Sequence, residues 1–252
     1  MKNIEKPVEN SLLERRSIRR YEREAIPAED MKFIYDAISN TPTSYNGQQF
    51  CVIDVVSQDK KEAQYEIIGQ KQIKTCNHFL VFCMDYNKIS KLAEAKGVDM
   101  PAFADTMDGV TVGIIDASLA LMSAMTAAES RGLGTNAIGY ARTANPAAVS
   151  KMLNLPKGVF VVCGLAIGVP REMPDLKPKM PLQVIVHTDS YSEEGMVDTL
   201  SAYDEEIRHY NATRAGSKTD NDWLNHILGY YREACHYEIL KALKEQGFDV
   251  KK

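Results

Sequence analysis

The longest apolar stretch of the chain runs from about Val110 to Ala128, and Asp116 lies within it. A membrane span does not readily accept a carboxylate in its middle, so this stretch predicts a buried core helix over residues 108–130. Small residues on several of its faces indicate close packing all round, and Gly132 is suited to end the helix. A long core helix requires further layers of structure around it.

Two other apolar runs predict strands at the centre of a sheet. Residues 79–84 and 159–169 are apolar at successive positions, which is typical of strands buried on both faces. Further strands are predicted over residues 50–56 and 182–187. Helices are predicted from Pro27 to about Ile38, from the Asn145-Pro146 cap to Leu153, and over residues 196–212 and 222–246, the last broken near Gly229.

Strands interspersed with helices predict a three-layer α+β fold (α/β/α) around a mixed central sheet. No linker divides the chain, so we expect one domain over residues 1–252, with residues 196–252 forming a helical extension. The polar segment 86–108 is expected to be an excursion on the surface. A hydrophobic fraction of 44% in 252 residues supports a sizeable core.

Composition excludes several classes of protein. A net charge of −4 argues against a general binder of nucleic acid or of anionic membranes. The first ten residues contain no apolar run, so no secretory signal is expected. The five cysteines include no C-x-x-C pair and predict small core residues in a reducing cytoplasm, with a redox or metal role as the minor alternative. No histidine has metal-ligand spacing with cysteines or carboxylates.

Polar groups suited to a phosphorylated ring cofactor are spread over several segments. Basic and hydroxyl groups suit a phosphate, while amides and backbone groups suit a polar heterocycle. The candidates are Arg15, Arg16, Ser17, Arg19, Ser44, Asn46, Gln48, Gln70, Ile138, Gly139, Lys177 and Lys179. Taken singly, these segments also fit solvated charged faces, an ordinary loop, or a helix cap followed by a turn at residues 132–134. A nucleic-acid patch over residues 15–20 is a further alternative.

In their order, these segments resemble the nitroreductase and flavin reductase family, in particular its larger, NADPH-preferring class. The resemblance covers nearly the whole chain. Its motifs are Arg16-Ser17-Ile18-Arg19, Gly69-Gln70-Lys71 followed by Val81-Phe82-Cys83, the segments 128–130, 132–134 and 138–139, and Asp175-Leu176-Lys177-Pro178-Lys179 with Pro181 and Val186-His187. It implies a nitroreductase-like fold with flavin mononucleotide (FMN) as cofactor.

The resemblance implies a role for each candidate residue. The FMN phosphate would be held by Arg15, Ser17, Lys177 and Lys179, with Arg16 in the same motif. Arg19 would lie near the pyrimidine side of the ring, where a cation stabilises reduced flavin. The ring or the ribityl chain would be met by Ser44, Asn46, Gln48 and Gln70, and by the backbone of Ile138 and Gly139. Arg214 would bind the 2′-phosphate of NADPH.

The implied activity is that of an FMN-dependent NAD(P)H oxidoreductase, transferring hydride by a ping-pong route to nitroaromatics, quinones or free flavin. The cofactor supplies the chemistry, so no catalytic side chain is named. The implied assembly is a homodimer with FMN at the interface, in which residues 196–252 wrap the partner.

This chain departs from the family pattern at three positions: Lys179 replaces an arginine, Tyr140 replaces a glycine, and Asp220 lies in a usually basic region. Two other functions stay open. One is a flavoenzyme of the same fold with another reaction, such as reductive dehalogenation, with residues 88–107 as its substrate lid. The other is a non-enzymatic, FMN-binding regulatory protein.

Overall fold

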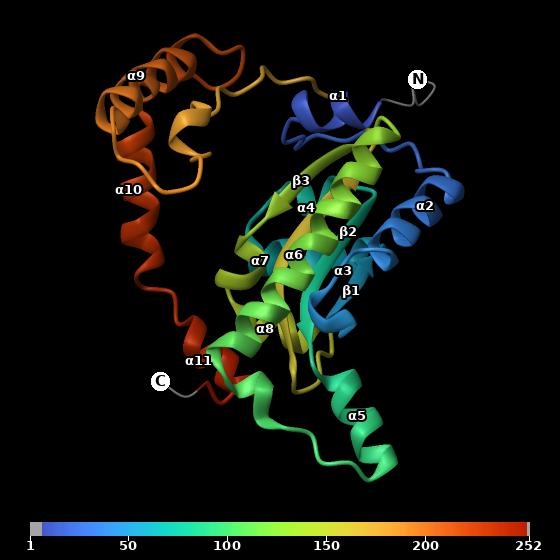
Figure 1. The fold of residues 1–252 in the computed structure, drawn as a ribbon. Helices are drawn as coiled ribbons and strands as arrows, with labels where there is room; N and C mark the ends of the chain where they lie inside the picture. Colours follow the sequence, from blue (N-terminus) through green and yellow to red (C-terminus); the bar gives the residue numbers. More distant parts are fainter. Residues whose placement is uncertain (1–6, 251–252) are drawn as a thin grey trace. The chain divides into compact units, whose positions relative to one another are not determined.

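A computed structural model describes residues 7–250 and divides them into two compact units (Figure 1). The first unit comprises residues 7–173 and 238–250, and the second comprises residues 174–237. Each unit is described by itself. Residues 1–6, which belong to the stretch where the sequence predicts no secretory signal, lie outside the described residues.

The first unit is built on one four-stranded sheet. Its strands are β1 (Phe50–Val55), β2 (His78–Asp85), β3 (Gly134–Ile138) and β4 (Val159–Gly168), in the spatial order β1-β2-β4-β3. The two apolar runs form the inner strands β2 and β4, as predicted. Every residue of β2 is buried except His78, which is half-buried. Fully apolar strands occupy the centre because both of their faces are covered.

The strand pairs of this sheet are all antiparallel, which corrects the expectation of a mixed sheet. A strand–helix–strand passage predicts parallel neighbours, and β3 does run in the same direction as β2. However, β4 lies between them and runs the opposite way. Within residues 7–250, parallel pairing is confined to an isolated bridge between Ser17 and Thr135.

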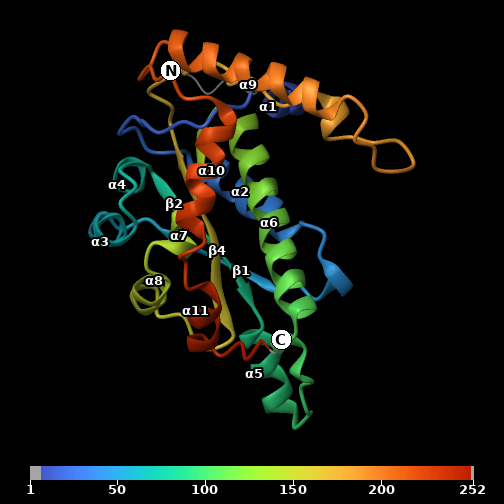
Figure 2. The same ribbon diagram turned by 90° about the vertical axis from the view of Figure 1, so that its left-hand side faces the viewer.

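Helices cover both faces of the sheet and confirm the three layers (Figure 2). One face carries α6 (Met107–Ser130), against which α2 (Ala28–Ser39) packs. The other face carries α3 (Gln58–Ile68), α4 (Gln72–Thr75), α7 (Tyr140–Thr143) and α8 (Pro146–Met152). Along β2, alternate side chains enter the two cores: Leu80, Phe82 and Met84 face the α6 layer, and Phe79, Val81 and Cys83 face the other layer.

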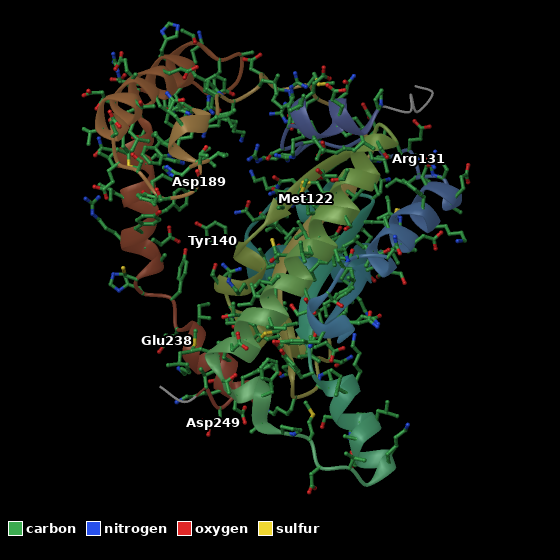
Figure 3. All side chains as sticks on the ribbon, viewed as in Figure 1. Met122, Arg131, Tyr140, Asp189, Glu238 and Asp249 are labelled. Atoms are coloured by element: carbon green, nitrogen blue, oxygen red, sulfur yellow. The ribbon has the colours of Figure 1, made fainter. Side chains whose placement is uncertain are left out.

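The ends of two predicted helices are confirmed with their physical cause. The side chain of Asn145 accepts a hydrogen bond from the N–H of Ala148, and Pro146 starts α8. Gly132, with φ of 74°, follows α6 in the left-handed conformation, and its N–H donates to the carbonyl of Glu129. The next side chain back, Arg131, reaches α2 (Figure 3), where its Nε lies 3.6 Å from Asp30.

The remaining elements of the first unit are short. They are α1 (Val8–Leu13), η1 (Ser44–Asn46), α5 (Asn87–Lys96), η2 (Ala102–Asp105) and α11 (Ile239–Glu245). The polar excursion predicted over residues 86–108 contains α5 and η2, and α5 has no buried residue. Edge strand β3 was not predicted, because its short glycine-containing sequence was interpreted as a cap and turn.

The second unit consists of η3 (Leu182–Val184), α9 (Met196–Thr213) and α10 (Trp223–Ala234). Helix α9 was predicted. The strand predicted over residues 182–187 is wrong: its apolar side chains Leu182, Ile185 and Val186 are exposed, and no β-bridge involves it among the described residues. The predicted break at Gly229 is also wrong, because Gly229 is helical, at a cost of about 1 kcal/mol, and the helix ends at Ala234.

Asp116 explains why a helix as apolar as α6 belongs to a core. By length and composition α6 could cross a membrane, but half of its apolar window is buried within the protein. The fully buried carboxylate of Asp116 accepts two backbone hydrogen bonds, from the N–H of Ser44 (2.9 Å) and the N–H of Gln49 (3.1 Å). The charge is therefore solvated by the protein itself.

We predict that Asp116→Ala lowers the free energy of unfolding by about 3 kcal/mol, because a buried and a partly buried N–H group lose their acceptor. Asp116→Asn keeps one acceptor oxygen and should lose less. Urea denaturation followed by circular dichroism measures both variants. Asp108→Ala, at an exposed aspartate of the same helix, is the control and should lose at most about 1 kcal/mol. An equal loss in Asp116→Ala and Asp108→Ala would contradict this account of the buried carboxylate.

Candidate functional site

The N-terminal basic segment is bonded to the sheet along residues 18–22. The N–H of Ile18 donates to the carbonyl of Thr135 on β3 (2.9 Å), and the N–H of Glu22 donates to the carbonyl of Val169 just after β4 (2.9 Å). Between them, the buried hydroxyl of Tyr21 donates to the carbonyl of Ile18 (2.6 Å). Burial raises the pKa of Tyr21 far above its usual value, so this hydroxyl stays a donor. The cationic side chains around it are therefore carried on an ordered backbone.

Arg15 and Arg16, at the start of this segment, each have an Nε donor that makes no hydrogen bond within the described chain. Arg15 Nε lies 3.6 Å from Glu129, whose carboxylate also accepts a hydrogen bond from the Thr135 hydroxyl. Arg16 donates through Nη1 to the carbonyl of Glu14 (2.9 Å). The Nε atoms of both arginines are buried and have no hydrogen-bond partner within the described part of the chain. Buried donors without partners are rare and suit an anionic ligand.

Arg19 and Gln70, predicted from separate segments, line one pocket. It has a volume of about 540 Å³ and is lined by Arg19, Arg20, Tyr21, Gly69, Gln70, Lys71, Gln72, Thr75 and Arg171. Gln72 Nε2 donates to Gln70 Oε1 (3.1 Å), which orients the Gln70 amide. The N–H of Arg19 donates to the carboxylate of Glu172 (2.7 Å). Four cations beside two amides and a threonine hydroxyl suit an anionic ligand with polar ring edges.

Seven of the nine lining residues are not among the predicted site residues, and four of these carry a cationic or amide side chain: Arg20, Lys71, Gln72 and Arg171. Lys71 and Gln72 directly follow Gln70, where Gly69 ends α3 with φ of 75° and turns the chain into α4. Arg171 is brought alongside by a backbone hydrogen bond from its N–H to the carbonyl of Arg20 (3.0 Å). Lys71 adjoins a predicted residue in sequence, but nothing in the sequence pairs residue 171 with residue 20.

The loop that carries Ser44, Asn46 and Gln48 is strained. Three of its non-glycine residues have positive φ: Tyr45 (58°), Asn46 (52°) and Gln48 (50°). Such conformations cost energy and persist only when the surroundings enforce them, and here Asp116 holds both ends of the loop. Asn46 and Gln48 are exposed, and none of the three predicted residues lines the pocket of Arg19 and Gln70.

Ile138 and Gly139 lie at the end of β3 and also lie outside the pocket lining. The Ile138 side chain is 3% exposed and packs in the core, so only its backbone is available to a ligand. A side chain built at Gly139 would meet no atom within 4 Å, which leaves its backbone open to close approach. Tyr140 begins α7 and is half-buried (Figure 3).

Lys177, Lys179 and Arg214 belong to the second unit. Both lysines are exposed, on the segment that precedes η3. Arg214 follows α9, and its Nε donates to the carbonyl of Ser217 (2.7 Å). The two segments are joined at Asp175, whose carboxylate accepts a hydrogen bond from the N–H of Ala215 (2.9 Å). This hydrogen bond ties the segment that contains Lys177 and Lys179 to the segment that contains Arg214.

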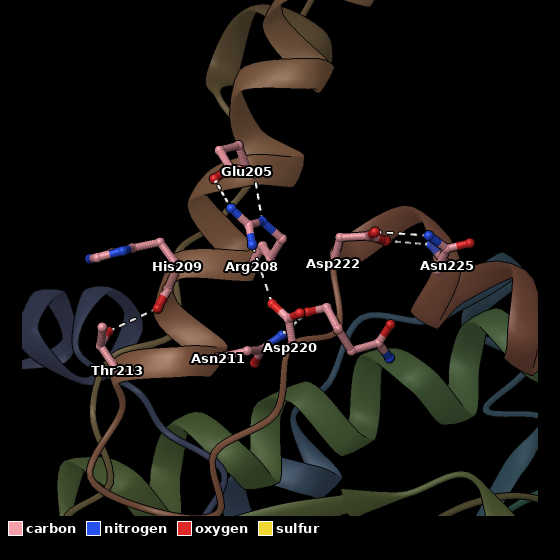
Figure 4. Close-up of polar contacts among 9 residues, drawn as sticks. Glu205, Arg208, His209, Asn211, Thr213, Asp220, Asp222 and Asn225 are labelled. Atoms are coloured by element: carbon pink, nitrogen blue, oxygen red, sulfur yellow. Dashed lines mark hydrogen bonds and ion pairs between the residues drawn. The ribbon is translucent and has the colours of Figure 1, made fainter.

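Asp220 does not stand as an isolated negative charge. Arg208 donates to both carboxylate oxygens of Glu205 (2.8 and 2.6 Å) and to Asp220 (3.2 Å), as Figure 4 shows. Asp222 accepts a hydrogen bond from the N–H of Asn225 (2.7 Å) and caps α10. The acidic residues of this loop are therefore engaged in holding the loop between α9 and α10. Among residues 7–250 no cluster of three or more histidine, cysteine or carboxylate groups could hold a metal.

Comparison with known proteins extends over both units. The chain is 36% identical over 244 residues to a Bacillus subtilis protein named FMN reductase [NAD(P)H], covering 96% of this chain and 98% of that protein. It is 30% identical to the oxygen-insensitive NADPH nitroreductase of Salmonella typhimurium, covering 92% and 94%. The solved structure of the hypothetical oxidoreductase YcnD from Bacillus subtilis matches with a TM-score of 0.92 and 35% identity, covering 97% and 99%.

Two family descriptions match consecutive parts of the sequence. Residues 12–169 match the nitroreductase family, and residues 177–251 match the C-terminal domain of the nitroreductase family. The first match includes the whole sheet and every lining residue of the pocket of Arg19 and Gln70 except Arg171. The second match includes Lys177, Lys179 and Arg214. Together with the fold, these matches show that the chain belongs to the nitroreductase family.

Proposed function

We propose that this protein is an FMN-dependent NAD(P)H oxidoreductase that acts on nitroaromatics, quinones or free flavin. The observation that carries the proposal is the shared pocket of Arg19 and Gln70, two residues far apart in sequence. The names of the relatives support it, since they include an FMN reductase that uses NAD(P)H and an NADPH nitroreductase. Their identity and near-complete coverage favour the same class of reaction here.

The residues present fit FMN by their chemistry. A phosphate needs several cationic or hydroxyl donors, and the buried Nε atoms of Arg15 and Arg16 make no hydrogen bond within the described chain, while Arg15 Nε lies 3.6 Å from the carboxylate of Glu129. A flavin ring edge needs amide and cationic donors, and Arg19 and Gln70 line the same pocket. When bound, FMN supplies the hydride chemistry, accepting from NAD(P)H and donating to the acceptor in a ping-pong sequence.

The roles proposed for the chain's own groups are binding and orientation. The phosphate-binding role is proposed for Arg15, Ser17, Lys177 and Lys179, and for Arg16 of the same N-terminal motif. Arg19 stabilises negative charge on the reduced ring, and its backbone is held by Glu172. The ring and ribityl chain are contacted by Ser44, Asn46, Gln48, Gln70 and the backbone of Ile138 and Gly139. Lys179 offers charge without the bidentate fork of an arginine.

Arg19→Ala tests this function directly. Loss of a charge-assisted contact is expected to raise the dissociation constant for FMN by about 10- to 100-fold. At saturating FMN, the variant should also be reduced more slowly by NADPH. Flavin fluorescence quenching measures the first effect and anaerobic stopped-flow absorbance measures the second.

The matched control for this test is Arg23→Ala. Arg23 is exposed and outside the pocket lining, four residues along the same segment. It should bind FMN and be reduced like the unaltered protein. Unchanged occupancy and unchanged reduction rate in Arg19→Ala would refute the role given to Arg19.

We further propose a homodimer with FMN at the subunit interface. Ile114, Ile115, Leu119 and Met122 form an exposed apolar stripe on α6, with exposed fractions of 38–46%. A stripe of this kind on a core helix fits burial against a second copy. The loop of Ser44, Asn46 and Gln48 lies outside the pocket of its own chain, which favours a site completed by the partner. Of the predicted extension over residues 196–252, the part that precedes α11 is proposed to wrap that partner, because residues 238–250 pack within the first unit of their own chain.

Leu119→Glu should weaken this dimer by about two orders of magnitude, because a carboxylate would be buried without a partner. Sedimentation velocity at micromolar concentration measures the change. Leu92→Glu is the control, since Leu92 is 57% exposed on α5 and lies off the stripe. A monomeric unaltered protein, or equal dimerisation of Leu119→Glu and the control, would refute the proposed interface.

NADPH is the donor we propose, with Arg214 binding the 2′-phosphate. The negative charge of Asp220 would oppose a phosphate, and Arg208, which also bonds Glu205, offsets part of that charge across 3.2 Å. The nitroreductase relative is named for NADPH, whereas the FMN reductase is named for both donors. We also propose a cytoplasmic location, to which the free cysteines of the described chain are suited.

A further inference from the structure

Two cysteines lie directly opposite each other in the sheet. Cys51 of β1 pairs with Cys83 of β2 in the antiparallel register. Opposed residues in an antiparallel pair point to the same face, and both side chains pack in the core that faces α3, α4, α7 and α8. None of the proposed flavin contacts involves either residue, so this pair is independent of the proposed function.

The ladder sets the separation of the two residues. The N–H of Asp85 donates to the carbonyl of its opposite residue Gln49 (3.0 Å), which makes this a hydrogen-bonded pair. Because such pairs alternate along antiparallel strands, Cys51 and Cys83 form the next hydrogen-bonded pair, with Cα atoms about 5.5 Å apart. Disulfides span Cα separations of about 4.4–6.8 Å, so the Cα separation of this pair is within the range that a disulfide can bridge.

The two cysteines differ in their exposure to solvent. Cys51 is half-buried on the edge strand and can meet a small solute, whereas Cys83 is fully buried. Hydrogen bonding with Cys51 and burial raise the pKa of Cys83 well above its usual value, so Cys83 is the less reactive of the two thiols. A partly exposed cysteine beside a buried one is the arrangement of an attacking and a resolving thiol.

We propose that Cys51 and Cys83 form a reversible cross-strand disulfide when the protein meets a hydroperoxide. The Cys51 thiolate attacks one peroxide oxygen, the O–O bond breaks, and water or an alcohol leaves, so Cys51 becomes a sulfenic acid. The Cys83 sulfur then attacks the Cys51 sulfur, the S–O bond breaks, and the oxygen and the Cys83 proton leave in a molecule of water. The two thiols lose two electrons, which reduce the peroxide, and both thiol protons end in the products.

The bond should be easy to reduce. Opposed residues have Cβ atoms about 4.5–5.5 Å apart, wider than the mean of about 3.8 Å in disulfides. Stretched disulfides are strained and belong to the labile class that cellular thiols reverse. The bridge would join β1 to β2 two residues beyond Gln49, where Asp116 holds the strained loop.

Thiol counting and peptide mapping test the proposal on the full-length protein. After hydrogen peroxide, two of the five thiols should be lost, and a proteolytic fragment should join the Cys51 and Cys83 peptides. Dithiothreitol should restore all five. Cys51→Ser and Cys51→Ala should abolish the joined fragment, and either variant suffices if the other folds poorly.

Cys235→Ser is the matched control, because Cys235 is exposed and has no cysteine opposite it. This variant should still form the Cys51–Cys83 fragment. The proposal is overturned if peroxide oxidises Cys235 while Cys51 and Cys83 stay reduced. It is equally overturned if Cys51 accumulates as a higher acid that is never joined to Cys83.

Discussion

The buried carboxylate of Asp116 is the interaction on which the arrangement of the first unit depends. It lies on the long core helix and accepts hydrogen bonds from the backbone at both ends of the loop that leads into β1. The three positive-φ residues of that loop keep their strained conformations because this charge holds the loop from inside. One side chain thus links the core helix, the start of the sheet and the segment proposed to meet the flavin.

The proposed cofactor site follows from how other segments are attached to the same sheet. The N-terminal segment bonds to β3 and to the residue after β4, which brings Arg19 to the turn between α3 and α4, where Gln70 lies. Binding groups come from loops, while the strands that position them are buried and apolar. This division explains why no catalytic acid or base is needed: the chain binds and orients, and the cofactor reacts.

Helices and strands were predicted correctly from the sequence where a single local feature determines them. Residues 108–130, the inner strands and the Asn145 cap were predicted because periodicity, apolar runs and capping act locally. Prediction failed where the local structure depends on pairing with a segment that is distant in sequence. Residues 134–138 form a strand only because β4 and residue 17 pair with them, while residues 182–187 have strand-like composition but no β-bridge in the described chain. Arg171 enters the pocket through a bond to Arg20, which no local pattern reveals.

The central claim is tested most directly by an anaerobic visible spectrum of the purified protein, taken before and after NADPH and, on a fresh sample, NADH. The account predicts a yellow protein that NADPH bleaches faster than NADH does, and that a nitroaromatic or quinone recolours. Yellow protein that neither donor bleaches would contradict the oxidoreductase and indicate an FMN-binding regulatory protein. A colourless protein that takes up no added FMN would contradict the flavin site itself.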